Sequence, residues 1–452
     1  MPIRKKPGRT VLLIPCVLAF AMASPRPAVC QPPQDQGDTS HQMHDMQGMQ
    51  GMSMTAINPA GLFLMDLSSG TSANPAAWPM PMIMTHLGAW NTMFMAEGFL
   101  SDIQESGPRG GDKLYSTNWA MITAEHRVGA NGAFEAVLML SLEPATITDR
   151  RYPLLFQTGE TAYGVPLTDA QHPHNLVMAL GFHYARAFSE RTILDVYFAP
   201  VGDPAIGPVA YPHRASAMEL PEAPISHHWQ DSTHIAYDVT TLGISRGKFK
   251  LEASGFHGAE PGENRWTIAQ GAIDSWSARL WFFPTKRWAA QFSAGRLTHP
   301  EALEPGDQTR LTGSVEYSRP VAGSNWSSSL IWGRTHSTAT LLDSNAYLAE
   351  TAVPIGRKNF LTGRAELVSK DDLFANTPLL EQSLAITYGS AFRIGAYTFG
   401  YTRDIDLFRH LETGIGGNFT AYSVPSAIAP EYGSHPVGGN IFLRLRLRPS
   451  AR

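Results

Sequence analysis

The chain has few cysteines, few charged residues and, after its N-terminal segment, no long uninterrupted apolar stretch. Cysteine occurs only 2 times in 452 residues. Because Cys16 lies in a segment that we expect to be removed on export, the mature chain keeps at most Cys30 and has no internal disulfide. Charged residues make up 16% of the sequence, below the roughly 25% of an ordinary soluble domain. No later segment offers the roughly 18 apolar residues of a membrane helix, so a membrane-resident chain of this sequence must cross with strands.

The charge balance argues against a nucleic-acid partner. Lys+Arg 35 against Asp+Glu 39 gives a formal net charge of -4, whereas a nucleic-acid-binding protein usually presents a strongly basic surface. Glycine, proline and aromatic residues are frequent, with Gly 40, Pro 33 and 10% aromatics. That composition is typical of many short strands joined by turns.

The N-terminal segment has the features of an export signal. Four basic residues precede an apolar stretch that is too short to span a bilayer. We predict a cleaved signal peptide over residues 1–30, with cleavage after Ala23 or after Cys30. Residues 31–80 follow as a Met- and His-rich tail, which we predict to be disordered because it has no period that could bury a core. Residues 81–452 are the predicted folded domain.

From about Met84 to the C-terminus, apolar and polar residues alternate in segments of about nine to fifteen residues, which predicts strands. Phe249 and Leu251, for example, flank Lys250, and the run over residues 441–448 alternates aliphatic residues with arginine. A tilted strand needs about 9–11 residues to cross a hydrocarbon layer about 30 Å thick. In a soluble sandwich the apolar side chains of the same strands would point into the interior, and any single strand fits that alternative.

The connections between these segments alternate between short and long. The short ones lie at 128–132, 189–191, 245–248 and 284–287, and the long ones at 144–174, 201–233, 257–273 and 297–308. Membrane barrels have short turns at one end and long loops at the other. The pattern therefore predicts an all-β fold, a transmembrane antiparallel up-and-down β-barrel in the bacterial outer membrane, with long His- and Pro-rich loops on one face. About seventeen candidate strands reduce to about 16, with about 14 and about 18 as alternatives, because single-chain bacterial barrels usually have an even number.

The predicted tail is rich in soft metal ligands. They are His41, Met43, His44, Met46, Met49, Met52 and Met54. Thioethers favour Cu(I), and imidazoles accept Cu(II) or Cu(I), so this tail is a candidate copper-binding segment. The alternative is a compositionally biased linker with incidental methionines.

A second group of candidate metal ligands lies in the long connections. It comprises His172, His174, His213, His227, His228, Asp231, His234 and Glu260. Because these connections share one face of the barrel, several imidazoles could meet there with carboxylates as further ligands. In the alternative interpretation, the loops fold into the lumen and use these side chains to satisfy buried backbone groups.

Neither a catalytic residue nor an organic cofactor site is assigned. Ser232 lies near Asp231 and His234, but no nucleophile elbow, phosphate loop or dinucleotide fingerprint occurs between a strand and a helix. Arg444, Arg446 and Arg448 share one face of the last strand. They would either attract anionic solutes or form ion pairs with acidic residues of neighbouring strands.

The motif QHPH over residues 171–174 and the motif SHHWQDSTH over residues 226–234 resemble an uncharacterised family of predicted bacterial outer-membrane barrels. The resemblance extends over most of residues 141–310. It implies an outer-membrane barrel, sometimes linked to copper or heavy-metal handling, and it implies no catalytic residue.

These observations predict an outer-membrane channel, or a component of metal-linked transport or resistance, whose lumen is narrowed by the His-rich loops 144–174 and 201–233. The expected partners are outer-membrane lipid and a small solute or metal ion, with copper as the candidate metal. Two alternatives remain open. One is an outer-membrane enzyme that uses His and Asp in the loops, and the other is a metal-binding or surface barrel without transport.

Overall fold

The structure is a computed structural model that describes residues 58–302, 306–321, 323–374, 391–405, 407–408 and 410–447. The predicted signal peptide and all seven candidate ligands of the tail lie outside these residues. Most of the described chain forms one sheet of seventeen strands. The short strand β1 (Ile83–Leu87) pairs with the first residues of β2.

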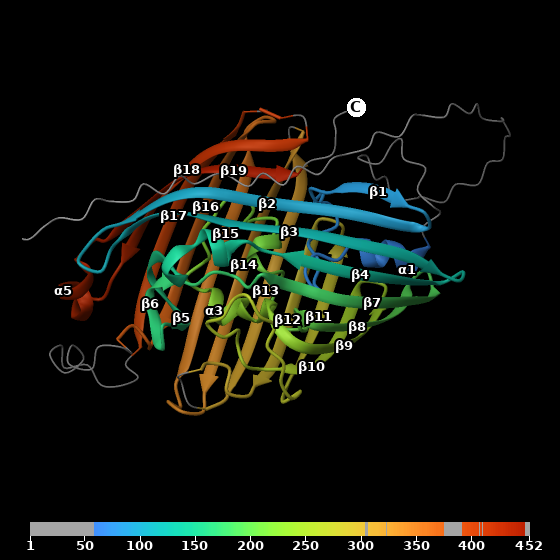
Figure 1. The fold of residues 1–452 in the computed structure, drawn as a ribbon, viewed down its shortest axis with the longest axis horizontal. Helices are drawn as coiled ribbons and strands as arrows, with labels where there is room; N and C mark the ends of the chain where they lie inside the picture. The colour runs from blue at the N-terminus through green and yellow to red at the C-terminus, as the bar shows by residue number, and fades with distance from the viewer. Residues whose placement is uncertain are drawn as a thin grey trace, which may run out of the picture. The chain divides into compact units, whose positions relative to one another are not determined.

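The other sixteen strands of this sheet form a closed antiparallel barrel (Figure 1). They are β2 (Trp90–Glu105), β3 (Asp112–Val128), β4 (Gly132–Leu140), β7 (Val177–Ser189), β8 (Thr192–Gly202), β9 (Ala236–Arg246), β10 (Phe249–His257), β11 (Ser275–Thr285), β12 (Trp288–Leu297), β13 (Gln308–Val321), β14 (Ser324–Ser337), β15 (Asp343–Pro354), β16 (Asn359–Lys370), β17 (Phe392–Asp404), β18 (Leu411–Ser423) and β19 (Val437–Leu447). Each strand pairs with the next around the ring, and the pairing of β19 with β2 closes it. The predicted up-and-down barrel of sixteen strands is therefore confirmed.

The exterior of the barrel is apolar and its interior polar. Leu251 on β10 lies opposite Leu280 on β11, which in turn lies opposite Phe292 on β12, and all three side chains are exposed. Their neighbours in sequence, Glu252 and Arg279, are buried and point the other way. A soluble barrel would have the reverse arrangement, so the strands have the alternation of a lipid-facing wall.

Several short elements complete the described chain. They are α1 (Pro59–Met65), α2 (Glu143–Thr146), α3 (His227–Gln230), α5 (Ala429–Tyr432), the 3-10 turns η1 (Thr148–Arg150), η2 (Tyr211–His213), η3 (Ser232–His234) and η4 (Ser426–Ile428), and a separate hairpin of β5 (Tyr152–Ala162) and β6 (Val165–Gln171). The helix α3 packs against β13, β14 and β15, and β5 packs against β2 and β3. None of the helices in the described part of the chain has the length and apolar character that a membrane crossing needs.

Residues 58–80 differ from the prediction for the tail. Asn58 caps α1 by accepting a hydrogen bond from the backbone N–H of Gly61 at 2.9 Å, and the apolar face of α1 packs against β4 and β7. Further along, the carbonyl of Thr71 accepts a hydrogen bond from Nζ of the inward-facing Lys250 at 2.8 Å. This segment is thus part of the folded unit. A helix of two turns is too short to produce a periodic signal in the sequence, which is why the predicted boundary was wrong here.

Candidate functional site in the barrel lumen

The connection between β8 and β9, residues 203–235, runs through the interior of the barrel; we call it the β8–β9 loop. All its residues are buried except Pro212 and His234, which are partly buried. The backbone N–H of Gly207 donates to Oγ of Ser293 on β12 at 2.9 Å, and Oγ of Ser226 donates to Glu366 on β16 at 2.6 Å. Because β16 lies on the far side of the ring from β8 and β9, the loop crosses the lumen.

Glycines on the loop and on the wall allow this close packing. Gly207 has φ +82°, and a Cβ there would lie 2.4 Å from the carbonyl oxygen of Gln230. On β14, a Cβ at Gly333 would lie 2.1 Å from the carbonyl oxygen of Trp229. Backbone atoms cannot move aside as a flexible side chain can, so both positions need glycine.

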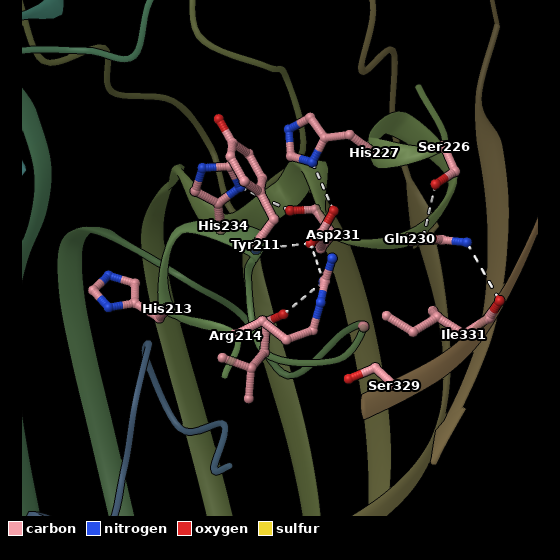
Figure 2. A network of polar contacts seen from close by, with 12 residues as sticks. Tyr211, His213, Arg214, Ser226, His227, Gln230, Asp231, His234, Ser329 and Ile331 are labelled. Carbon is pink, nitrogen blue, oxygen red and sulfur yellow. Dashed lines mark hydrogen bonds and ion pairs between the residues drawn. The ribbon is translucent and has the colours of Figure 1, made fainter. Parts of the chain in front are cut away.

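Arg214 holds the loop to the wall through buried ion pairs. Its side chain has no exposed surface; Nη1 donates to Oδ2 of Asp231 at 2.7 Å, and Nε donates to Oε1 of Glu350 on β15 at 2.6 Å. Nδ1 of His227 lies 2.6 Å from the other oxygen of Asp231 (Figure 2). The Arg214 guanidinium, together with the hydrogen bond to His227, holds the pKa of Asp231 below its usual range despite burial. Asp231 is therefore an ionised hub of the loop.

Five predicted histidines form one contiguous group around this hub, which we call the histidine cluster. Its members are His172, His174, His227, His228 and His234. The ring centroids of His174 and His227 lie 5.3 Å and 5.2 Å from that of His234. His228 extends the chain of rings, 5.3 Å from His227 and 5.9 Å from His172. The sequence prediction that the two long connections bring imidazoles together thus holds for these five residues.

Burial keeps three members of the cluster neutral. It lowers the pKa of His172 to about 3 and the pKa values of His228 and His234 well below the ordinary 6.5. A neutral imidazole keeps a lone pair and can bind a metal ion without first losing a proton. Nε2 of His172 already contacts Oε1 of Glu160 at 3.1 Å, and Nδ1 of His234 contacts the carbonyl of Asp231 at 2.7 Å. His228 is therefore the member of the cluster best prepared for metal binding.

His228 also lies beside two carboxylates. One ligand atom each from His228, Glu260 and Glu301 lies within 4.8 Å of the others. Among the described residues, neither ring nitrogen of His228 has a hydrogen-bond partner. Oε1 of Glu260 is held by Ser232 at 3.1 Å and by Arg310 at 3.3 Å, which fixes the orientation of the carboxylate. One imidazole and two carboxylates form a donor set suited to Zn(II) or Cu(II).

Two of these three residues, His228 and Glu260, were predicted as ligands, and Glu301 was missed. Glu301 follows β12 in the long connection 297–308. Nothing in the surrounding sequence indicates that its carboxylate lies beside His228. The other predicted ligands have different surroundings. Nδ1 of His174 contacts Oε2 of Glu143 at 2.9 Å, and both oxygens of Asp231 are engaged by Arg214 and His227. These contacts make His174 and Asp231 positioning residues of the loop.

His213 lies apart from the cluster, and its ring points away from Asp231 in Figure 2. It packs against Trp119 with ring centroids 4.5 Å apart, and its Nε2 lies 3.3 Å from Sδ of Met139. Next to it is a cavity of about 60 Å³ lined by methionines. These methionines were not among the predicted metal ligands. Their positions at inward parity on neighbouring strands were the one available signal.

The residues around Ser232 do not form a nucleophile–base pair. The Ser232 hydroxyl donates to Glu260 and accepts from Nη1 of Arg310 at 2.7 Å. Nδ1 of His234 lies 2.7 Å from the backbone carbonyl of Asp231. Among the contacts of the described residues, Ser232 is thus bound to a carboxylate and a guanidinium and not to an imidazole, as a nucleophile would be.

The lumen arginines of β19 are paired with acids. Arg444 contacts Asp404 at 2.5 Å and also Glu219 of the β8–β9 loop, and Arg446 contacts Glu97 at 2.5 Å and Glu219 at 3.2 Å. Of the two interpretations drawn from the sequence, the structure therefore supports ion pairing for these two residues. Glu219 adds a further anchor of the loop on the wall. Arg448 lies outside the described residues.

Comparison with solved structures identifies the fold. A complex of Salmonella typhi OmpF with daunomycin matches with a TM-score of 0.51 at 6% identity, covering 81% of this chain and 100% of that one. An anion-selective porin from Comamonas acidovorans matches at 0.47 and 10%, covering 79% and 100%. The outer-membrane channel DcaP of Acinetobacter baumannii matches at 0.45 and 8%, covering 79% and 98%. No protein-family model and no curated protein matches the sequence.

The fold class follows from the closed barrel and from the OmpF match together. The chain has the fold of outer-membrane porins, a closed barrel of sixteen antiparallel strands. Within that fold it carries a buried, ion-paired loop with a histidine cluster in its lumen.

Proposed function

We propose that this chain is an outer-membrane channel for a small solute, in which the β8–β9 loop is the constriction, and that the solute is a transition-metal ion, with copper as the first candidate. The observation that carries the proposal is the path of the loop across the lumen. The loop starts and ends at β8 and β9 and is anchored on the opposite wall, by Arg214 to Glu350 on β15 and by Ser226 to Glu366 on the neighbouring β16. A solute passing through the barrel would have to pass this loop and its histidine cluster.

The chemistry of the cluster supports a metal ion as the solute. His228, Glu260 and Glu301 supply borderline nitrogen and hard oxygen donors, a set that accepts Cu(II) or Zn(II). A site that passes an ion must bind it firmly enough to admit it and weakly enough to release it. With three protein ligands, such a site leaves coordination positions for water, which favours exchange.

Export by a signal peptide over residues 1–30 and copper capture by the tail belong to the same proposal. The thioethers of the tail would capture Cu(I) and supply it to the barrel. Removing residues 31–55 tests the role of the tail. We expect a lower Cu(I) stoichiometry with an unchanged barrel, and an unchanged stoichiometry would contradict it.

A metal-binding barrel without transport is the second candidate. It is favoured by the buried ion pairs that fix the loop, because a loop tied to several strands of the barrel resists movement. The two functions differ in one measurable quantity, which is the passage of ions through the closed barrel.

The deciding experiment is planar-bilayer recording of the refolded full-length chain and of a variant in which residues 209–230 are replaced by a short Gly-Ser linker. We expect small, metal-sensitive conductance steps for the wild type and steps several-fold larger for the variant. The matched control shortens the connection 338–342, which is largely exposed and carries none of the candidate ligands, and should leave the step size near that of the wild type. Wild-type protein without steps, beside a variant that conducts, would refute the channel and leave the non-transporting barrel.

A further inference from the structure

The lumen of this barrel contains a concentration of thioether groups. Of the ten methionines in the described residues, eight line a single cavity of about 60 Å³ between the wall and the β8–β9 loop. They are Met65, Met80, Met82, Met93, Met95, Met121, Met139 and Met178. A water molecule needs only about 10–15 Å³ on this measure, so the cavity has room for an ion with its ligands.

Three of these methionines form a row across adjacent strands. Met95 on β2 lies directly opposite Met121 on β3, and Met121 lies directly opposite Met139 on β4. All three side chains are buried at inward parity. Directly opposed residues in an antiparallel sheet have Cβ atoms about 4.5–5.5 Å apart, so their flexible side chains can bring the sulfur atoms together.

His213 of the loop completes this arrangement. Its Nε2 lies 3.3 Å from Sδ of Met139. Metal bonds of about 2.0 Å to nitrogen and about 2.3 Å to sulfur, at a tetrahedral angle, separate the two donor atoms by about 3.5 Å. The observed spacing therefore matches that of two ligands of one ion. Carboxyl groups of Glu135 and Asp203 line the same cavity and can balance a positive charge.

We infer that this methionine cavity binds a soft monovalent cation, Cu(I) or Ag(I), with Met139 and His213 as ligands and with Met121 and Met95 available to complete the coordination. Thioether and imidazole donors are neutral and polarizable, and they select Cu(I) over hard cations such as Mg²⁺ and Ca²⁺. The inference deepens the proposed function by adding a second metal site, which prefers the monovalent ion, and it rests on that function only for the assumption that metal ions enter the barrel. Binding itself does not require conductance.

Ordinary hydrophobic packing is the competing explanation, since methionine often fills irregular gaps. In that case the contact between His213 and Met139 is a weak N–H···S hydrogen bond. The two explanations differ in which property of the methionine side chain they require. Packing needs only the volume of the side chain, which leucine supplies at little cost. Coordination needs the sulfur atom.

The test uses the full-length chain in detergent micelles, labelled with ¹³C at the methionine methyl groups, and Ag(I) as a redox-inert probe in chloride-free buffer. Single Met→Leu variants assign the methyl signals. We expect the signals of Met95, Met121 and Met139 to shift on titration and those of Met84 and Met218, which do not line the cavity, to stay in place. Shifts confined to the tail methionines would overturn the inference.

Stoichiometry supplies a second measurement. The variant M95L/M121L/M139L should bind one Ag(I) fewer per chain than the wild type, while M84L/M218L should bind the same number as the wild type. An equal number for wild type and the triple variant would overturn the inference. Bilayer recording of the triple variant without metal separates the two proposals. If the triple variant loses silver binding but keeps normal conductance steps, both the channel and the methionine site are supported. If the wild type binds silver but shows no conductance steps, only the channel is refuted.

Discussion

Replacing Arg214 by methionine would test how firmly the β8–β9 loop is held in the lumen. In the wild type, the guanidinium is fully buried between Asp231 of the loop and Glu350 of β15. Arg214→Met keeps an apolar side chain of comparable length but removes the cation that the two carboxylates share, which leaves Asp231 with His227 and Glu350 with Arg364 as the remaining partners. Removing one partner of a buried ion pair costs about 3–5 kcal/mol, because the remaining charge is uncompensated.

This cost falls mainly on the docking of the loop. The barrel strands keep their backbone hydrogen bonds, whereas the loop loses its charged anchor. Since about 1.4 kcal/mol corresponds to a factor of ten, the population of undocked loop should rise by about two to three and a half powers of ten. An undocked loop exposes Glu219 and Glu222, which are buried in the wild type.

The assay is limited proteolysis of the refolded protein in lipid vesicles with a protease that cleaves after glutamate. When opening and closing are fast, the cleavage rate follows the open population. We expect cleavage after Glu219 or Glu222 to accelerate by at least about a hundredfold in the variant. The control is Arg296→Met, which removes an exposed ion pair with Asp307 and should change the rate little.

A second substitution separates charge from packing. Adding Asp231→Asn to Arg214→Met neutralises the loop carboxylate that has lost its guanidinium, so cleavage should slow again relative to the single variant. Equal cleavage rates for wild type and Arg214→Met would refute the reasoning that ion pairs hold the loop. A double variant that is cleaved faster than Arg214→Met would show instead that the loss of packing dominates.

Three further outcomes are expected. Gly333→Ala should loosen the loop and enlarge the conductance steps, because its Cβ would lie 2.1 Å from a backbone carbonyl oxygen of the loop. The control Gly313→Ala, whose Cβ would have its nearest neighbouring atom at 3.7 Å, should behave as wild type. Equal step sizes for the two variants would contradict the close packing. Burial raises the pKa of Asp203 from 3.8 to about 7, so ionisation of this carboxyl group opposes folding increasingly as the pH rises between those values. Asp203→Asn should therefore be more stable than wild type by an amount that grows from about zero near pH 4 to about 4 kcal/mol above pH 7, measured as the free energy of unfolding by urea in vesicles. A stability difference independent of pH would contradict this. His228→Gln should weaken Cu(II) or Zn(II) binding by at least about tenfold in calorimetric titration. Because burial holds the pKa of His228 well below 6.5, the metal affinity of the wild type should change little between pH 7.5 and pH 6. A steep loss of affinity over that interval would contradict a neutral buried ligand.

The strands of the barrel wall could be predicted from the sequence because the alternation of apolar and polar residues within a strand is a local pattern. The alternation of Phe249 and Leu251 with Lys250 states which side chains face lipid, and no knowledge of neighbouring strands is needed. The alternation of short and long connections likewise follows from strands entering and leaving by the same face. Both signals concern residues close in sequence, so the fold and its strand number could be predicted.

The interior was less accessible because it depends on contacts between distant residues. Period two indicated that Met95, Met121 and Met139 point inward, but not that the register would place them opposite one another. Nor does the sequence show that Glu301 would lie beside His228 once the β8–β9 loop had folded into the lumen. These neighbours are set by the closure of the ring and the path of the loop, which no local pattern encodes.

The β8–β9 loop crosses the lumen and rests against the wall at β14. Oγ of Ser216 in the loop lies 2.7 Å from Oγ of Ser329 on β14. A cysteine pair, Ser216→Cys and Ser329→Cys in a Cys30→Ser background, should therefore form a disulfide in isolated outer membranes, detected as a cross-linked peptide by mass spectrometry. Moving the second cysteine to Ser327 should abolish the bond. Free cysteines at 216 and 329 that react with a membrane-impermeant maleimide would contradict the account.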